Sequence, residues 1–417
     1  MKVVHLNTSD FGGAAIAAIQ LHEALLEQGV ESDLLTLNKT RNDVPRHHRV
    51  APFDLGGSPT IDMLRYKARR AMEVLGVLED RHNAPDNKAL LDRPPGHEIF
   101  TVPYSYFQIL DHPLVQAADV IHLHWVSYGM VDQRAFFLAC TKRVVWTMHD
   151  MNPFTGGCHH ADACDGFIDL CYNCPQLKDP GHAHTYWRYK DDGIQDSTDL
   201  QLQLVAPSQW LADRAMSSSI MRGIPCSVIP NGFDTDRMRY REAALEQLDL
   251  PTDRRIVLFN ALNTGDPRKG MQLLIPALEM LRDPKVMLVA IGGGANVSAP
   301  GVEVHHVGFI GSRDRLALYY SAADVFVLPS LAENLPNTIT ESLLCGTPVV
   351  AFGVGGIPEQ VGPSDGILVE EMTSEALNAG IASALQMDWD AVRISERATQ
   401  RYDRRTIAKA YQRIYSS

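Results

Sequence analysis

Short apolar runs alternate with helix-like segments along the whole chain. The apolar runs lie at residues 2–7, 34–37, 119–125, 143–150 and 202–205 in the first half, and at 255–260, 286–294, 302–310, 325–328 and 349–352 in the second. Helix-like segments follow several of them, as at 14–28 and 271–281. An apolar run, a helix and a second apolar run form a β-α-β unit, whose parallel strands have a right-handed connection. The pattern therefore predicts an α/β protein with two Rossmann-like domains facing each other across a cleft.

Length and composition support two domains and exclude several classes of protein. A chain of 417 residues is too long for one core. No apolar run approaches the ~18 residues of a membrane span. The net charge of -12 and a pI of about 5.7 argue against nucleic acid as the main partner. Met1 and Lys2 lead straight into a strand, so we expect no secretory signal and a cytoplasmic location.

The stretch from Asp324 to Pro358 carries the most specific pattern in the sequence. Two carboxylates, Glu333 and Glu341, lie between its apolar runs and are separated by seven residues. This spacing places Glu333 in the loop after a strand and Glu341 about two turns further on, inside a helix. Both would lie near the carboxyl edge of a sheet, where open α/β sheets bind ligands, and ionised carboxylates suit a ribose or hexose diol. Two ordinary surface acids are the simpler alternative, but a Gly355-Gly356 loop follows the second run.

This stretch resembles the C-terminal half of retaining GT-B glycosyltransferases of family 4, whose signature is E-x7-E followed by a G-T-P-V-V strand entry. The resemblance implies transfer of a hexose from a nucleotide diphosphate sugar, with UDP or GDP as the nucleotide, to an acceptor hydroxyl with retention at the anomeric carbon. It implies a glycan or lipid-linked acceptor in bacterial surface polysaccharide assembly. No catalytic metal or other cofactor is expected, because the Asp234-Thr235-Asp236 triplet lies in a hinge segment.

The resemblance also implies domain boundaries. Residues 1–204 would form the acceptor-binding domain, with a cysteine-rich insert at 156–176, and residues 205–395 the nucleotide-sugar-binding domain. The final helical stretch, 374–417, is long and amphipathic. Its last part, 396–417, would cross back to the first domain.

Carried over residue by residue, the family pattern assigns a donor site. Glu333 would hold hydroxyls of the donor sugar and Glu341 the ribose diol. Arg268 and Lys269 would stabilise the departing diphosphate, although Asn263 stands where relatives often carry an arginine. The other implied donor contacts are the Gly12-Gly13 loop at the phosphates, Phe309 and Ile310 at the base, and Asn334, Leu335, Pro336, Asn337 and Thr338 at the helix start.

Two strands of the first half end in side chains that suit a sugar. His124 and Trp125 end one strand, and His149 and Asp150 end the next. Imidazole and carboxylate groups hydrogen-bond hydroxyls, and an indole stacks on a pyranose face. One such histidine is usually structural, but four such residues at one sheet edge favour a binding site. His149 matches the family histidine that contacts the donor sugar or leaving oxygen, so we count it as catalytic, and the other three would border the acceptor.

Four of the seven cysteines fall within 17 residues, in the pattern C-x5-C-x6-C-x2-C. They are Cys158, Cys164, Cys171 and Cys174. In a reducing compartment such spacing favours Zn²⁺ over disulfides, although paired or free cysteines remain alternatives. Four thiolates leave no open position for a catalytic water, so a bound zinc would be structural.

The segment 61–82 predicts a helix with an apolar stripe and a cationic patch. The patch suits peripheral contact with an anionic inner membrane surface or a lipid-diphosphate acceptor, but a solvated face explains it as well, and we favour the latter.

Three other functions fit parts of the pattern. A phosphorylase has the same fold but needs a cofactor lysine that we do not identify, and a sugar-nucleotide epimerase would convert the donor without an acceptor. A non-enzymatic binding module organised by zinc is the alternative from another class, and it predicts that Glu333 is dispensable.

Overall fold

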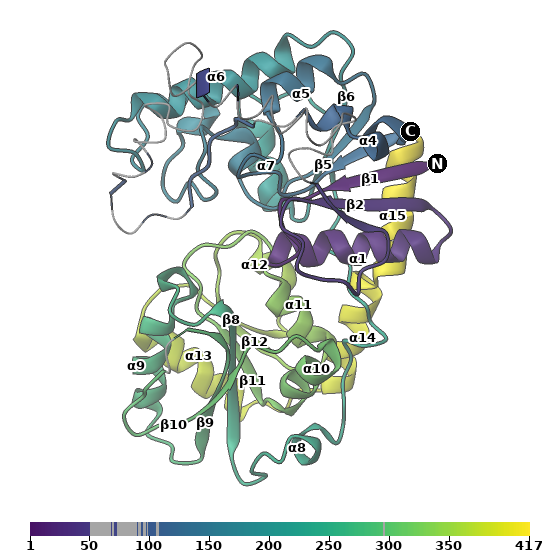
Figure 1. The fold of residues 1–417 in the computed structure, drawn as a ribbon. Helices are drawn as coiled ribbons and strands as arrows, with labels where there is room; N and C mark the ends of the chain where they lie inside the picture. The colour runs from purple at the N-terminus through teal and green to yellow at the C-terminus, as the bar shows by residue number, and fades with distance from the viewer. Residues whose placement is uncertain are drawn as a thin grey trace. The chain divides into compact units, whose positions relative to one another are not determined.

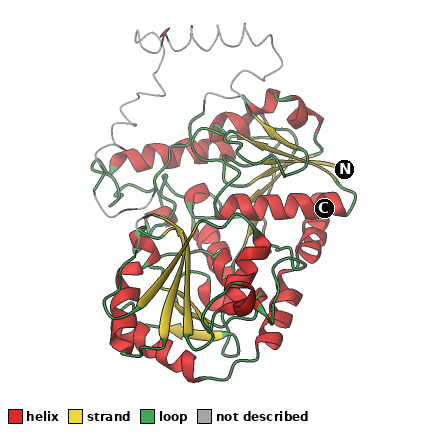
Figure 2. Cartoon of the chain, turned by 60° about the horizontal axis from the view of Figure 1, so that its bottom comes forward, coloured by secondary structure: helices red, strands yellow, loops and turns green. Residues whose placement is uncertain are grey.

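The fold is described here from a computed structural model (Figures 1 and 2). The structure describes residues 1–50, 99–105, 108–294 and 297–417, together with residues 68, 71, 72, 90, 93, 94 and 97. Apart from three of these positions, the predicted basic helix 61–82 lies outside the described residues. None of the helices in the described part is long and apolar enough to cross a bilayer.

The chain forms two compact units. The first contains Met1–Ile229 and Ala408–Ser417, and the second contains Pro230–Ile407. The division comes later than residue 204, because β6 (Gln201–Ala206) and β7 (Cys226–Val228) still belong to the first sheet. The return to the first unit comes at Ala408, inside the last helix, rather than at residue 396.

The first unit is built on a seven-stranded sheet in the order β3-β2-β1-β4-β5-β6-β7, and its described strand pairs are parallel. Its other strands are β1 (Lys2–Leu6), β2 (Glu31–Thr36), β3 (His47–Arg49), β4 (Val120–Leu123) and β5 (Arg143–Thr147). Its helices are α1 (Gly13–Glu27), α4 (Pro113–Ala117), α5 (Gln133–Ala139), α6 (Gly181–Gln195) and α7 (Gln209–Ser217), with short 3-10 turns at Ile109–Asp111, Asn152–Phe154 and Gly166–Ile168.

The second unit is built on a six-stranded sheet in the order β10-β9-β8-β11-β12-β13, again with parallel pairs. The strands are β8 (Arg255–Asn263), β9 (Val286–Gly293), β10 (Glu303–Gly308), β11 (Val325–Leu328), β12 (Val349–Phe352) and β13 (Gly366–Val369). The helices are α8 (Ala244–Gln247), α9 (Met271–Leu281), α10 (Arg313–Ala322), α11 (Asn337–Leu344), α12 (Ile357–Gln360), α13 (Ser374–Gln386) and α14 (Ala391–Tyr402), with a 3-10 turn at Pro267–Lys269. The last helix, α15 (Arg404–Ser416), begins in this unit and belongs to the first unit from Ala408 onward.

Alternation along β11 explains why this strand is apolar throughout. Val325 and Val327 point into a core shared with α9 and α13, whereas Phe326 and Leu328 point into a core shared with α10 and α11. Successive side chains on a strand point to opposite faces, and a parallel sheet is covered by helices on both. The predicted α/β class with two Rossmann-like domains is confirmed.

The C-terminal stretch is divided into three helices rather than one. Asp390 caps the start of α14 by accepting a hydrogen bond from the amide of Arg393, and Asp403 accepts from the amides of Arg405 and Thr406 at the start of α15. Aspartate side chains compete for backbone amides in this way and mark helix starts rather than interiors. The end of α15 packs on the first sheet, where Tyr411 and Tyr415 hydrogen-bond residues of β5 and β4 (Figure 1).

Candidate functional site

Three neighbouring strands of the second unit, β8, β11 and β12, carry interlocked loops at their carboxyl ends. The amide of Leu331, after β11, donates to the carbonyl of Arg268, after β8, at 2.8 Å. The amide of Gly356, after β12, donates to the carbonyl of Asn334 at 2.8 Å. Gly355 has a φ of 60°, and a Cβ there would lie 1.7 Å from the carbonyl oxygen of Glu333. The three loops therefore hold the backbone of residues 331–334 in one position.

Glu333 is the charged centre of these loops. Its side chain is 9% exposed and contacts two cations, Lys269 and Arg268, and the Arg268 Nη1 lies 3.3 Å from Glu333 Oε1. The same Nη1 donates to the carbonyl of Ala332 at 3.0 Å. Both cations come from the 3-10 turn after β8, which Asp266 caps by accepting from the amide of Arg268. A carboxylate with low exposure is thus ion-paired with two side chains that a short, capped turn holds in place.

Glu341 lies inside α11 and has a different environment. It is buried, and the hydroxyl of Tyr320 donates to its Oε2 at 3.0 Å. The Nδ2 of Asn260, on β8, donates in turn to the Tyr320 hydroxyl at 2.9 Å. Burial raises the pKa of Glu341 to about 7, because the charged carboxylate loses water that the Tyr320 hydrogen bond only partly replaces. The two carboxylates of the E-x7-E pattern therefore differ, one ion-paired and one poised to titrate near neutral pH.

Eight more of the residues predicted at the donor site lie at three places in this unit. Asn334 and Leu335 are buried in the loop before α11, Pro336 is the residue before its first turn, and Asn337 accepts a hydrogen bond from Asn231. Thr338 is half-buried on the first turn. Phe309 and Ile310 follow β10, with Phe309 73% exposed, and Asn263 ends β8, where its Oδ1 accepts from the amide of Gly265.

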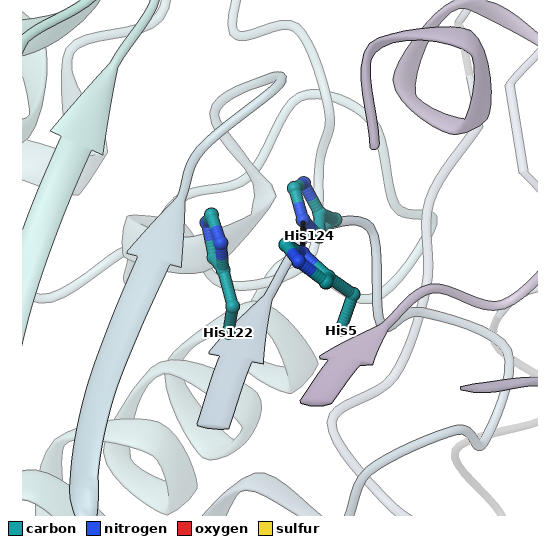
Figure 3. Close-up of side chains that lie close together, drawn as sticks. All are labelled: His5, His122 and His124. Atoms are coloured by element: carbon teal, nitrogen blue, oxygen red, sulfur yellow. Dashed lines mark hydrogen bonds between the residues drawn. The ribbon is translucent and has the colours of Figure 1, made fainter. Parts of the chain in front are cut away.

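In the first unit, three imidazoles form a hydrogen-bonded chain. His5 Nδ1 lies 3.0 Å from His124 Nε2, and His124 Nδ1 lies 3.2 Å from His149 Nε2. His5 lies on β1 opposite His122 of β4, and His124 directly follows β4 (Figure 3). Burial keeps these rings neutral, lowering the pKa of His149 to about 4 and those of His5 and His124 well below the usual value.

The hydrogen bonds between these three imidazoles have a preferred donor-to-acceptor direction. In the described part of the structure the buried His5 Nε2 has no hydrogen-bond partner, and an unpaired acceptor is tolerated better than an unpaired N–H. His5 then donates from Nδ1 to His124, which donates from its own Nδ1 to His149. This order places the proton of His149 on Nδ1. The resulting neutral tautomer persists across physiological pH, because the pKa of His149 is about 4.

We also considered whether these histidines could bind a metal ion. Within the described ranges, one group of three possible ligands has all its ligand atoms within 4.8 Å of one another, and it consists of His5, His122 and His124. The rings of His122 and His124 stack, with centroids 4.1 Å apart and planes inclined by 30°. Both nitrogens of His122 are hydrogen-bonded, to Tyr415 and Thr147. Stacked rings direct their lone pairs side by side rather than at one point, so this geometry favours a hydrogen-bonded cluster over a metal centre.

Trp125 and Asp150, which directly follow His124 and His149 in sequence, are hydrogen-bonded to each other. The Trp125 Nε1 donates to Asp150 Oδ2 at 2.8 Å, and His159 Nδ1 lies 2.7 Å from the same oxygen. Burial opposes ionisation of Asp150, but the charge and hydrogen bond of His159 outweigh it and lower the pKa of Asp150 to about 2. The indole is therefore held by an ionised carboxylate. At the start of α1, Gly12 has a φ of 87°, which favours glycine, and Gly13 opens the helix.

Sequence reasoning missed the supporting residues His5, His159, Tyr320 and Asn260. His5 sits in an apolar strand, where a histidine is usually structural, and His159 directly follows Cys158 in the cysteine-rich segment. Tyr320, on α10, contacts Glu341 across 21 residues of sequence, and Asn260, on β8, contacts Tyr320 across 60. No local pattern connects them, because the contact depends on how α10 packs beside α11.

Two family models together match most of the sequence, and curated relatives match it along most of its length. The family model Glycosyltransferase Family 4 matches residues 11–237, and the model Glycosyl transferases group 1 matches residues 241–401. The D-inositol 3-phosphate glycosyltransferase of Mycolicibacterium smegmatis is 30% identical over 371 residues, which cover 86% of this chain and 75% of the relative. WcaC of Escherichia coli is 27% identical over 376 residues, which cover 86% of this chain and 85% of the relative.

Solved structures give the same result at the level of the fold. Sucrose-phosphate synthase from Thermosynechococcus elongatus superposes with a TM-score of 0.63 at 19% identity, covering 100% of this chain and 98% of the other. Anabaena Alr3699/HepE in complex with UDP gives 0.62 at 17% identity, covering 100% of both chains. The predicted GT-B fold class is confirmed. Because the family 4 model matches more than half of the sequence, and a 30% identical relative covers most of it, the chain belongs to glycosyltransferase family 4.

Proposed function

We propose that this glycosyltransferase moves a hexose from a nucleotide diphosphate sugar to a hydroxyl of a glycan or lipid-linked acceptor, with retention at the anomeric carbon. The observation that carries the proposal is the Glu333 carboxylate, held by Arg268 and Lys269 at the carboxyl edge of the second sheet. A carboxylate in this position accepts hydrogen bonds from sugar hydroxyls. The two cations beside it offer charge to a departing diphosphate.

The proposed reaction needs no protein nucleophile. The bond between the anomeric carbon and the donor phosphate oxygen breaks while the acceptor oxygen bonds to the same face of that carbon. The acceptor proton passes to the departing phosphate oxygen. Arg268 and Lys269 stabilise the negative charge that collects on the diphosphate, and electrostatic stabilisation of this kind is usually the largest catalytic contribution. His149, neutral and protonated on Nδ1, would donate a hydrogen bond to the sugar or the leaving oxygen.

For the donor, we propose a UDP- or GDP-sugar. The solved Anabaena Alr3699/HepE structures contain UDP and UDP-glucose, which supports UDP-sugars as the first donors to test. Glu341 would hold the ribose diol, and the exposed ring of Phe309 suits contact with the base. Starch Synthase IV from Arabidopsis thaliana, bound to ADP, has a similar fold, so adenine nucleotides belong in the same test.

For the acceptor, we propose a sugar of a growing surface polysaccharide. The relative WcaC is named for colanic acid biosynthesis, and TuaC of Bacillus subtilis, 31% identical over 183 residues, for teichuronic acid biosynthesis. Trp125, held by the ionised Asp150, offers an aromatic face for a pyranose ring, and His124 lies next to it. These three residues would border the acceptor.

The test is a product analysis with UDP-, GDP- and ADP-sugars and a panel of glycan and lipid-linked acceptors. One donor should yield a transferred sugar whose anomeric configuration, measured by NMR, is the same as in the donor. An inverted product would contradict retention. Conversion of the donor sugar without any acceptor would instead indicate an epimerase.

The titration of Glu341 predicts a pH dependence of donor binding. A diol is bound best by the ionised carboxylate, and the pKa of Glu341 is about 7 in the unliganded protein, so affinity should fall as pH drops below neutral. Between pH 8 and pH 6 the ionised fraction falls about tenfold, which sets the expected loss of affinity. Calorimetry with the sugar nucleotide, whose diphosphate does not titrate in this range, measures it. In Glu341→Gln the affinity should be lower and independent of pH; an equal pH dependence in this variant would exclude Glu341 as its source.

A further inference from the structure

We propose that Cys158, Cys164, Cys171 and Cys174 bind one structural Zn²⁺ as four thiolates, and that the buried ammonium of Lys190 is the counter-charge of this centre. The proposal is independent of the donor and acceptor, because metal content is measured without either. It concerns the segment 150–174, which carries Asp150 and His159.

The four cysteines line one cavity. Its volume is about 20 Å³, and Phe100 and Phe167 are among its other lining residues. One water-sized sphere needs about 10–15 Å³, so the space suits a single small ion. Cys158, Cys171 and Cys174 are 8% exposed, Cys164 is partly exposed, and all four are free of disulfides. The cavity thus gathers four soft ligands, the set that Zn²⁺ prefers in structural sites.

The backbone around the cavity provides donors for sulfur. The amide of Gly156 donates to Cys171 Sγ at 3.3 Å, and the amide of Gly166 donates to Cys164 Sγ at 3.4 Å. Hydrogen bonds from outer groups orient metal ligands, and amide donors favour the thiolate form over the thiol. Sulfurs around a zinc ion lie about 2.3 Å from it. No three of the four sulfurs lie within 4.8 Å of one another, so binding would draw them closer together.

Lys190, on α6, supplies the second and independent observation. Its side chain is 0% exposed, and its Nζ donates to the carbonyls of Asn152 and Thr155. In the described part of the structure it forms no ion pair with a carboxylate. Burial lowers the pKa of Lys190 to about 8, and the charged forms of Cys158, Cys171 and Asp150 would oppose this shift. A buried ammonium beside neutral thiols is costly, whereas a zinc ion with four thiolates has a net charge of -2 that Lys190 partly neutralises.

The cavity is connected to the proposed acceptor residues. The amide of Met151 donates to the carbonyl of His159 at 3.0 Å, and Thr155 donates from its hydroxyl to the carbonyl of Cys158 at 2.7 Å. Fixing Cys158 therefore fixes His159, which orients Asp150. The metal would act by ordering this segment, not by touching the reacting atoms.

The first measurement is the metal content of the full-length protein by plasma mass spectrometry, purified without chelator, with one equivalent of zinc expected. Cys171→Ser and Cys174→Ser should lose it, whereas the matched control Cys226→Ser, whose thiol lies on β7 outside the cluster, should retain it. Less than a tenth of an equivalent in the wild type, iron in place of zinc, or equal zinc in the Cys171→Ser and Cys226→Ser proteins would overturn the proposal.

Two further measurements keep the proposal testable where a serine variant fails to fold. Wild-type protein stripped of metal and titrated with Co²⁺ should show the visible absorption of tetrahedral thiolate coordination at one equivalent; its absence would overturn the site.

Lys190→Met should weaken zinc binding about tenfold in competition with a chelator. It should also raise the melting temperature of the metal-free protein relative to the wild type, since a buried charge is removed. If Lys190 has only a structural role, Lys190→Met should lower the melting temperature by the same amount with and without zinc.

Discussion

Replacing Glu333 with glutamine should reduce the rate of sugar transfer about 10²–10³-fold, a loss typical of removing one preorganised electrostatic contact at a reaction centre. Glutamine keeps the size of the side chain but loses the charge that holds Lys269 and Arg268. Both cations would then take other positions, and the sugar hydroxyls would lose a strong acceptor. Steady-state kinetics with the donor that the product analysis selects measures the effect, which should appear in kcat more than in KM for the donor.

The matched control is Glu375→Gln, which neutralises an exposed carboxylate on the first turn of α13 in the same unit. It should leave kcat unchanged. A Glu333→Gln protein with more than half of the wild-type kcat would refute the assigned role, and would favour a binding module or a site elsewhere.

Replacing Gly355 with alanine should lower the free energy of unfolding by more than about 3 kcal/mol, in the range that only specific backbone or core defects produce. The new Cβ would meet the carbonyl oxygen of Glu333 at 1.7 Å and its carbonyl carbon at 2.8 Å. Neither atom belongs to a flexible side chain, so the loop after β11 has to move. Glu333 would be displaced with it, and transfer should be lost even in protein that remains folded. Urea denaturation with a spectroscopic readout measures the stability.

Gly301→Ala separates the clash from the backbone conformation. Gly301 has a φ of 76° in the same unit, but a Cβ there would have no atom within 4 Å. Gly301→Ala should lower the free energy of unfolding only by the strain of a left-handed backbone, about 1–2 kcal/mol. Equal losses in the two variants would mean that the contact between the loops after β12 and β11 contributes nothing.

Much of the proposed donor site could be predicted because its residues are close in sequence. Glu333, Glu341 and the Gly355-Gly356 loop belong to one β-α-β unit, whose strand ends and helix turn have fixed spacings. The pairing of Glu333 with Lys269 and Arg268 was not predicted. The sequence assigns these cations to the diphosphate, and the separation of about 64 residues along the chain hides their direct contact with Glu333.

The sequence alone predicted the strands other than β3, β7 and β13, the two α/β halves and the candidate residues at the strand ends, because periodicity and turn chemistry are local. Tertiary structure alone decided which of these groups meet. It brings His5 into hydrogen-bond contact with His124, which contacts His149 in turn. It also brings the Tyr320 hydroxyl to Glu341 and the Lys190 ammonium close to Cys158 and Cys171. It also sets protonation, since Glu341 and Asp150 are both carboxylates but their pKa values move in opposite directions, to about 7 and about 2. The physical reason is that desolvation and ion pairing depend on what packs around a group, and no spacing along the chain encodes that directly.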